Sequence, residues 1–415
     1  PMSFVGWLDH SEDEQQQVRE LLRMFTEKGT VDDLGIGTVR DAISNRVFPG
    51  TSVIQTRARY FLFIPWIFGN AERRRHHQLL QTAEYHERKL IDALIEGGDH
   101  EGLIGRQARK DVRTLPSAIY WAGLSTYGIF QSGHLTRQQY DRLAKRGSRA
   151  TMHEEELVER DRGFWHAGIP EPPEGFFDFE RADFSLTGDE ARWLAERMLS
   201  TEVFEGPHLL GVYLRRLLAG RPIPATAFWE DAAAEDIPQE LGALVRHGER
   251  FSATVRGAAL LYNLMLREFR DDDDRGDRDA AASLRVDFDT WAAEATRSNL
   301  AHWCRNLDDF WEILGNQARI PVTTRTFIDA WSQLIATMPP RDLADAPAAR
   351  TLIEERELQH KRVQARFGNR SRLQAWRGDS GLTPLEYRWS GVRRILQDIQ
   401  YGVGTNTGAA TDAAH

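Results

Sequence analysis

The chain has 415 residues, of which 41% are hydrophobic and 28% are charged, and its formal net charge is −9. These values are typical of a folded globular protein, and the length predicts more than one domain. A single cysteine, Cys304, excludes an internal disulfide framework and any zinc site built from several cysteines.

Apolar residues at three- and four-residue spacing predict helices through the first part of the chain. The expected helices cover residues 12–28, 38–48, 53–68, 71–97, 115–130 and 136–146. The helix at 53–68 is apolar on almost every side and contains Pro65, so we expect a kink or a break there.

Residues 151–186 differ from what precedes them and indicate a connector between two domains. Three prolines and four phenylalanines stand among acidic residues, at positions 170, 172, 173, 176, 177, 179 and 184. Prolines at this density interrupt helices and strands, and we expect the aromatic rings to hold the segment against a surface.

Helical patterns resume after the connector. They cover residues 188–200, 208–219, 239–247, 251–270, 283–314, 323–337, 348–367 and 390–400. Alternating strand patterns are scarce, so the sequence predicts a mainly α protein of two helical domains with little or no β structure. The tail at 403–415 is rich in Gly, Ala and Thr, and we expect it to be disordered.

Charge divides the two expected domains. Residues 51–150 contain 16 Lys and Arg against 9 Asp and Glu, whereas residues 151–415 contain 32 against 44. The sequence therefore predicts a basic helical domain at 2–150 and an acidic helical domain at 187–402. A basic region in an acidic protein attracts polyanions, although it can also neutralise acidic neighbours within the same fold.

The basic domain contains a pattern that resembles a helix-turn-helix. Helices at 38–48 and from residue 53 onward would be joined by a four-residue turn at 49–52 that includes a glycine. Polar and basic residues near the start of the second helix, where a recognition helix meets bases, are Gln55, Arg57 and Arg59. Candidate phosphate contacts around them are Arg73, Arg74, Arg75, Arg106, Arg109, Lys110 and Arg113.

Catalytic and metal-binding motifs are scarce. The chain has no Gly-Lys-Ser/Thr of a phosphate loop, no His-Glu-x-x-His and no Gly-x-Ser-x-Gly. The acidic run at 271–279 resembles a calcium loop, but Arg275 and Ala282 occupy two ligand positions. We therefore expect no catalytic residues, no metal site and no cofactor, and the balance favours a protein that is not an enzyme.

Several sequence blocks at both ends of the chain resemble a bacterial family of unknown function. The blocks are residues 3–9 (SFVGWLD), 34–41 (LGIGTVRD), 48–52 (FPGTS), 55–63 (QTRARYFLF), 116–121 (PSAIYW) and 387–389 (YRW). The resemblance implies an association with gene clusters of anti-phage defence, and hence helicase or nuclease subunits as partners. It implies no catalytic residues.

These observations support three hypotheses. The first is a non-catalytic subunit of an anti-phage defence system that binds DNA or a partner protein through its basic N-terminal half and docks other subunits through its acidic C-terminal half. The second is a metal-dependent nuclease whose carboxylates come from distant segments. The third is a structural adaptor without nucleic-acid contact, which buried pairing of Arg57 and Arg59 with carboxylates would support. No apolar stretch approaches the roughly 18 residues of a membrane span, so we expect no membrane contact. The single cysteine favours a cytoplasmic location.

Overall fold

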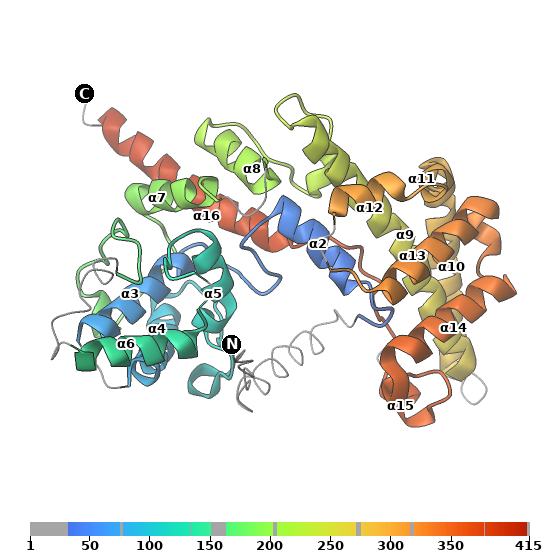
Figure 1. Ribbon diagram of the computed structural model, residues 1–415, viewed down its shortest axis with the longest axis horizontal. Coiled ribbons are helices and arrows are strands. Elements are labelled where there is room, and N and C mark those ends of the chain that lie inside the picture. The colour runs from blue at the N-terminus through green and yellow to red at the C-terminus, as the bar shows by residue number, and fades with distance from the viewer. Residues whose placement is uncertain are drawn as a thin grey trace, which may run out of the picture. The chain divides into compact units, whose positions relative to one another are not determined.

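The computed structural model describes residues 32–74, 78–133, 135–150, 163–201, 206–270, 275–315, 319–376 and 378–412. Within these ranges the chain is mainly helical (Figure 1). The extended backbone that they contain pairs at one isolated antiparallel bridge, between Phe130 and Trp165. The prediction of a mainly α protein with little or no β structure is confirmed.

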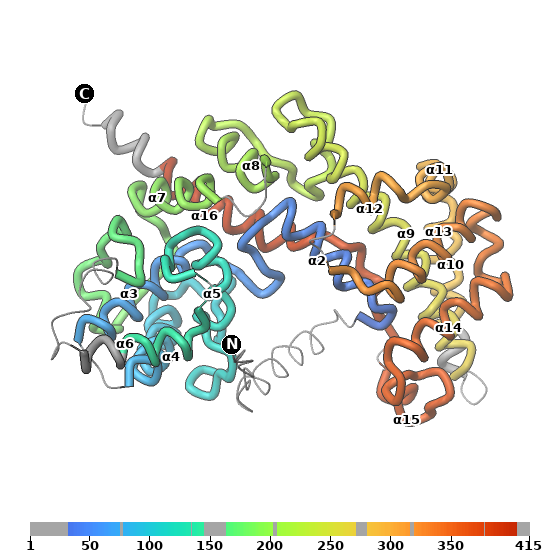
Figure 2. Tube along the Cα trace, in the orientation of Figure 1, coloured from blue at the N-terminus to red at the C-terminus, as the bar shows by residue number. Residues whose placement is uncertain are grey.

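Contacts within the chain define two compact units. Unit 1 consists of Pro1–Ala42, of which the structure describes residues 32–42, together with Arg246–Leu385. Unit 2 consists of Ile43–Val245 and Glu386–His415. Two helices, α2 (Gly37–Val47) and α9 (Gln239–Arg270), each contain a boundary between the units. Each unit thus combines segments that are distant in the sequence, as the colours in Figure 2 show.

Unit 2 contains the basic region at 51–150. Seven α-helices lie entirely within this unit in the described ranges. These are α3 (Tyr60–Arg73), α4 (Leu79–Gly97), α5 (Pro116–Thr126), α6 (Arg137–Ala150), α7 (Gly188–Leu199), α8 (Leu209–Leu218) and α16 (Trp389–Asp412). Helix α3 packs against α4 and α5, and α16 packs against α7 and α8. Eleven residues of α3 are buried, including Phe61, Phe63 and Trp66, which explains why this helix is apolar on almost every side.

Unit 1 is organised around the part of α9 that follows residue 245. Its other helices are α10 (Arg275–Arg297), α11 (Leu300–Cys304), α12 (Asp308–Leu314), α13 (Val322–Thr337), α14 (Pro347–Lys361) and α15 (Arg370–Gln374). Two buried tryptophans donate to α9 carbonyl groups: Trp291 to Ala253 at 2.8 Å and Trp331 to Thr254 at 2.9 Å. The Trp291 ring lies so close to Gly257 that a Cβ there would be 2.1 Å from it, so this position requires glycine.

The predicted helix-turn-helix is wrong in its second half. Helix α3 begins at Tyr60 and not at residue 53, so residues 48–59 form a long irregular connection instead of a four-residue turn. The reason is tertiary: the backbone N–H groups of Thr56 and Arg57 lie 2.7 and 3.0 Å from the Tyr120 hydroxyl, outside any helical ladder. The helix itself continues through Pro65.

The connector expected at 151–186 is described from residue 163 and lies inside unit 2. Its aromatic side chains pack on α3, because the Phe176 ring stacks on Phe63 at 5.6 Å between centroids and the Phe184 ring lies 5.2 Å from Tyr60. The Trp66 indole also donates to the carbonyl of Pro170 at 2.7 Å. The expectation that aromatic residues hold this segment to a surface is confirmed for its described part.

Several other predicted boundaries differ from the structure. Helix α4 begins at Leu79 and not at residue 71, α5 ends at Thr126 and not at residue 130, and α14 ends at Lys361 and not at residue 367. Residues 239–270 form one continuous helix, because Gly248 does not interrupt the ladder. The expected helix 283–314 is divided into α10, α11 and α12, with Asn299 in the left-handed conformation (φ 53°) at the first division. Helix α16 extends to Asp412, past residue 403, since adding a residue to an existing helix adds a hydrogen bond. The predicted helix 12–28 lies outside the described residues.

The N-terminus of α8 predicts a pH-dependent stability. The Nδ1 atom of His208 accepts a hydrogen bond from the N–H of Gly211 at 3.0 Å, and burial lowers the pKa of His208 from 6.5 to about 4. Protonated imidazole cannot accept this bond, so the stabilisation is present above pH 6.5 and is lost as the pH falls through the folded-state pKa.

We expect urea unfolding of the wild type to show a greater loss of stability from pH 7 to pH 4.5 than His208→Asn does, by about 1 kcal/mol or more. Asparagine keeps the capping acceptor and does not titrate. An equal loss in the two proteins would contradict this account of the cap.

Candidate functional site

The first three candidate DNA contacts, Gln55, Arg57 and Arg59, lie in the connection before α3 and face into unit 2. Gln55 is only 2% exposed. Its amide donates to the Gly50 carbonyl at 3.3 Å and accepts from the Ser52 N–H at 3.3 Å. Because both ends of the amide are occupied within a turn, Gln55 serves the local backbone in this structure.

Arg57 joins three segments of unit 2. Its Nε donates to Asp398 of α16 at 3.0 Å, and its Nη1 donates to Asp99 at 3.1 Å and to the carbonyl of Glu101 at 2.9 Å. The guanidinium group also lies 4.5 Å from the centre of the Phe184 ring. Burial raises the pKa of Asp398, and the hydrogen bond and positive charge of Arg57 oppose that rise.

Arg59 is buried more deeply and binds α7. Its Nη2 donates to Glu190 at 3.0 Å and its Nη1 donates to Asp183 at 3.0 Å. The Arg59 and Glu190 side chains are 7% and 4% exposed, so the pair is largely removed from water. Both arginines are therefore paired with carboxylates inside unit 2, as the adaptor hypothesis requires.

The other candidate contacts lie on the surface. Arg73 and Arg74, at the end of α3, are exposed, and Arg75 lies outside the described residues. Four exposed cations gather in residues 106–113, which we call the basic segment: Arg106, Arg109, Lys110 and Arg113. Its one acidic residue is Asp111, so the segment carries three net positive charges. None of the four cations makes an ion pair with any residue that the structure describes.

The basic segment projects between two anchored ends. Before it, the Thr56 hydroxyl donates to the Gly102 carbonyl at 2.6 Å and the Ile104 N–H donates to Tyr60 at 3.0 Å. Val112 and Leu115 are buried, at 8% and 4% exposure, near its other end. Between these anchors a single 3-10 turn, η1 (Arg109–Asp111), has all of its residues exposed.

Arg109, at the start of that turn, has a φ of 45°, in the left-handed region. This backbone conformation costs a non-glycine residue on the order of 1 kcal/mol. Strain of this kind persists where the surrounding structure imposes it, and it is common at binding loops.

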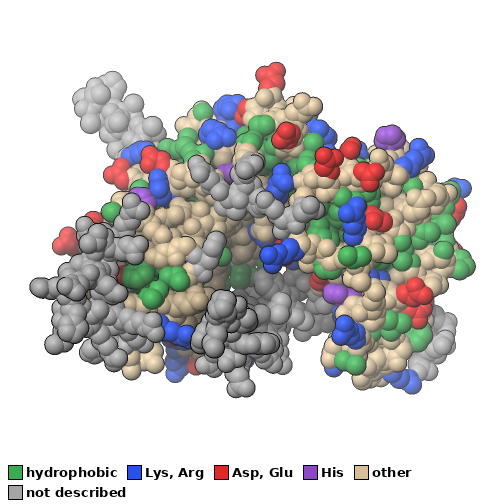
Figure 3. Space-filling model, viewed as in Figure 1, with side chains coloured by type: hydrophobic (Ala, Val, Ile, Leu, Met, Phe, Trp, Pro, Cys, Tyr) green, Lys and Arg blue, Asp and Glu red, His purple; other side chains and the backbone are tan. Residues whose placement is uncertain are grey.

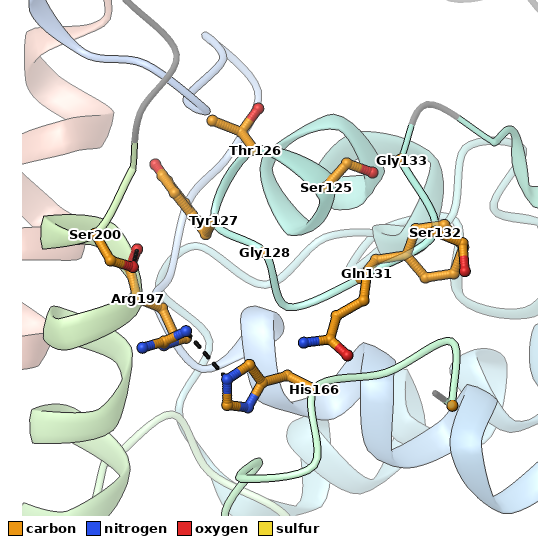
Figure 4. A pocket seen from close by; sticks show the side chains of 12 residues that line it. Ser125, Thr126, Tyr127, Gly128, Gln131, Ser132, Gly133, His166, Arg197 and Ser200 are labelled. Carbon is orange, nitrogen blue, oxygen red and sulfur yellow. Dashed lines mark hydrogen bonds between the residues drawn. The ribbon is translucent and has the colours of Figure 1, made fainter. Parts of the chain in front are cut away.

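Unit 2 also contains a polar cavity of about 650 Å³ that none of the candidate residues lines. Figure 4 shows its wall, in which Arg197 of α7 and His166 point toward each other. Gln131 and His166, each next in sequence to a residue of the Phe130–Trp165 bridge, both line the cavity.

A family model for a family of unknown function matches residues 2–402, nearly the whole chain. The chain belongs to the DUF6361 family. The predicted membership of an uncharacterised family is thereby confirmed. No curated protein and no solved structure matches the DUF6361 chain.

Two further findings concern the part of the DUF6361 chain that the structure describes. It contains no group of three or more His, Cys, Asp and Glu side chains placed to hold a metal ion. None of its helices combines the length and the apolar content that crossing a bilayer requires.

Sequence reasoning missed the partners of the DUF6361 arginines and the cavity. Asp398 is 341 residues from Arg57, and Glu190 is 131 residues from Arg59, so no local spacing relates them. The cavity is lined mainly by loop residues, including Gln131, Ser132 and His166, whose spacing matches no motif. The composition of residues 106–113 indicates only that their four basic side chains are exposed.

Proposed function

We propose that this protein is a DNA-binding subunit of a bacterial defence complex, and that the basic segment makes the contact with DNA. The observation that supports the proposal is the presence of four exposed cations, Arg106, Arg109, Lys110 and Arg113, within eight residues and without ion-pair partners among the described side chains. Unpaired guanidinium and ammonium groups at this density attract a phosphate backbone. The defence context comes from the family resemblance alone.

The form of the basic segment favours contacts with phosphates over contacts with bases. Its only regular structure is the three-residue turn η1, which is too short to lie along a major groove as a recognition helix does. Lysine and arginine on a surface loop bind phosphates without distinguishing sequence. The binding is therefore expected to be independent of sequence and strongly dependent on salt.

The adaptor function is the second candidate, and a different observation favours it. Arg57 and Arg59 form salt bridges that join the connection before α3 to α16 and α7, respectively. On the face drawn in Figure 3, basic and acidic side chains are interspersed over the helices of unit 1. A surface of mixed charge is suited to docking another protein, whose identity co-purification from the native host would establish.

The DNA contact is tested by fluorescence anisotropy with a labelled duplex at 50 and 200 mM salt. The test variant replaces Arg106, Arg109, Lys110 and Arg113 by Gln. Each lost phosphate contact lowers the salt slope by about 0.9, so four contacts account for a change on the order of 100-fold in affinity between these salt concentrations. We expect the variant to lose most of this dependence and to bind weakly at both concentrations.

The control variant removes the same charge from unit 1, by replacing four exposed arginines by Gln: Arg305, Arg319, Arg362 and Arg372. It should retain wild-type affinity. Absence of binding by the wild type at 50 mM salt, or an equal loss in the control, would refute the DNA contact. The nuclease hypothesis is tested in the same samples by adding magnesium or manganese and looking for cleavage products.

A further inference from the structure

The wall of the cavity in unit 2, as far as the structure describes it, has one cation and no anion. Among the described residues that line it, Arg197 is the only one with a formal charge, and the remainder are polar, aromatic or glycine. The Nε of Arg197 is buried and has no hydrogen-bond partner among the described residues. The guanidinium group of Arg197 thus has donor capacity that no described residue uses, and a ligand with acceptor atoms suits the cavity that this residue lines.

The contact between Arg197 and His166 does not satisfy the arginine. Its Nη1 lies 3.1 Å from the Nε2 of His166, while the Nδ1 of the same ring accepts from the N–H of Gly168 at 3.0 Å. A neutral imidazole carries one proton and can accept at only one of its nitrogens. If Nδ1 accepts from Gly168, then Nε2 carries the proton, and Arg197 faces another donor.

Two of the neutral donors on the wall are Gln131 and Ser132. The Gln131 amide and the Ser132 hydroxyl line the cavity, and neither makes a side-chain hydrogen bond with the residues that the structure describes. The donors therefore come from three places in unit 2: helix α7, the strand-like segment at 166 and the loop at 131–132. Figure 4 shows Gln131 beside His166 on the same side of the cavity.

We propose that this cavity binds a small phosphomonoester, with Arg197 and His166 holding its phosphate group. A phosphate group has three terminal oxygens and accepts hydrogen bonds from several directions, which suits donors on three elements better than a planar carboxylate does. The cavity, at about 650 Å³, also has room for the organic part of a metabolite. This site is independent of the proposed contact with DNA.

Ligand binding at this site should change the pKa of His166. Burial, followed by the positive charge of Arg197, lowers the pKa of His166 and so favours the neutral ring. No acidic side chain among the described lining residues opposes this effect. A bound phosphate dianion supplies the opposite charge, and its binding should raise the pKa of His166.

The experiment follows the ring C–H signal of His166 by NMR through a pH titration, alone and with millimolar ribose 5-phosphate, inorganic phosphate or acetate. We expect ribose 5-phosphate to raise the pKa of His166 and to bind more tightly than inorganic phosphate, with acetate weaker than both. Arg197→Gln should weaken the binding of ribose 5-phosphate by about tenfold or more. Arg197→Lys keeps the charge but loses the planar guanidinium group, so its affinity for ribose 5-phosphate should lie between those of the wild type and Arg197→Gln.

The matched control is Arg192→Gln, because Arg192 lies on the same helix and its salt-bridge partner Asp189 is exposed. This variant should bind as the wild type does, and circular dichroism would verify that each variant is folded. The proposal is overturned if ribose 5-phosphate leaves the His166 signal unchanged, or if Arg197→Gln responds as the wild type does. Equal affinity for inorganic phosphate and ribose 5-phosphate would overturn the assignment of a phosphomonoester.

Discussion

Replacing Arg59 by Ala should destabilise unit 2 by about 3–5 kcal/mol, because it leaves Glu190 as a buried carboxylate without its cation. The two side chains are 7% and 4% exposed, so water cannot easily replace the lost partner. Among the described residues, Glu190 then retains only the N–H of Thr187, which donates to it at 3.0 Å as part of the α7 capping box. The free energy of unfolding in urea, followed by circular dichroism, measures the effect.

The matched control is Arg106→Ala, which removes the same side chain from an exposed position in the basic segment and should change stability by less than about 0.5 kcal/mol. The double variant Arg59→Met with Glu190→Gln removes both charges and should recover part of the loss. A loss under about 1 kcal/mol for Arg59→Ala would contradict the internal role of this arginine and would reopen the prediction that it contacts DNA.

Replacing Glu357 by Ala should destabilise unit 1 by about 3–5 kcal/mol, because its carboxylate is the acceptor for several buried donors. Glu357 lies on α14 and is fully buried. It accepts from the backbone N–H groups of Arg366 and Phe367 at 2.9 and 3.0 Å, and from the hydroxyl of Tyr262 on α9. Alanine would leave these donors unsatisfied where water does not reach them.

Hydrogen exchange of peptides from α14 and from residues 362–367 reports on unit 1 separately from unit 2. Faster exchange is expected in Glu357→Ala, and Glu357→Gln should lose less protection because it keeps one oxygen acceptor. Glu354→Ala, at an exposed position one turn earlier on α14, should leave exchange unchanged. Similar exchange in Glu357→Ala and Glu354→Ala would contradict the network.

The sequence predicts the helices of this protein well, because periodicity is a local property. Helices α7, α8 and α13 begin and end within about a residue or two of their predicted bounds. The start of α3 could not be predicted in this way. Backbone N–H groups before Tyr60 donate to the side chains of Tyr120 and Asp398 instead of to helical carbonyl groups. These partners come from positions that only the folded chain brings near.

The candidate site, too, could be predicted only in its local features. Composition and spacing identify the arginines, but they do not show which of them have carboxylate partners. Arg57 is paired with Asp99 and Asp398, whereas Arg109 is exposed on a short turn. The cavity at Arg197 could not be predicted, because loops and a single bridge bring its residues together without a repeating pattern.

The most direct test of this account is chemical modification of arginine by phenylglyoxal, with and without duplex DNA, read out by mass spectrometry of peptides. Arg106, Arg109 and Arg113 should react readily in the free protein and be protected by DNA, while Arg57 and Arg59 should react slowly in both samples. Ready modification of Arg57 and Arg59 that DNA suppresses, with no protection at 106–113, would contradict the account.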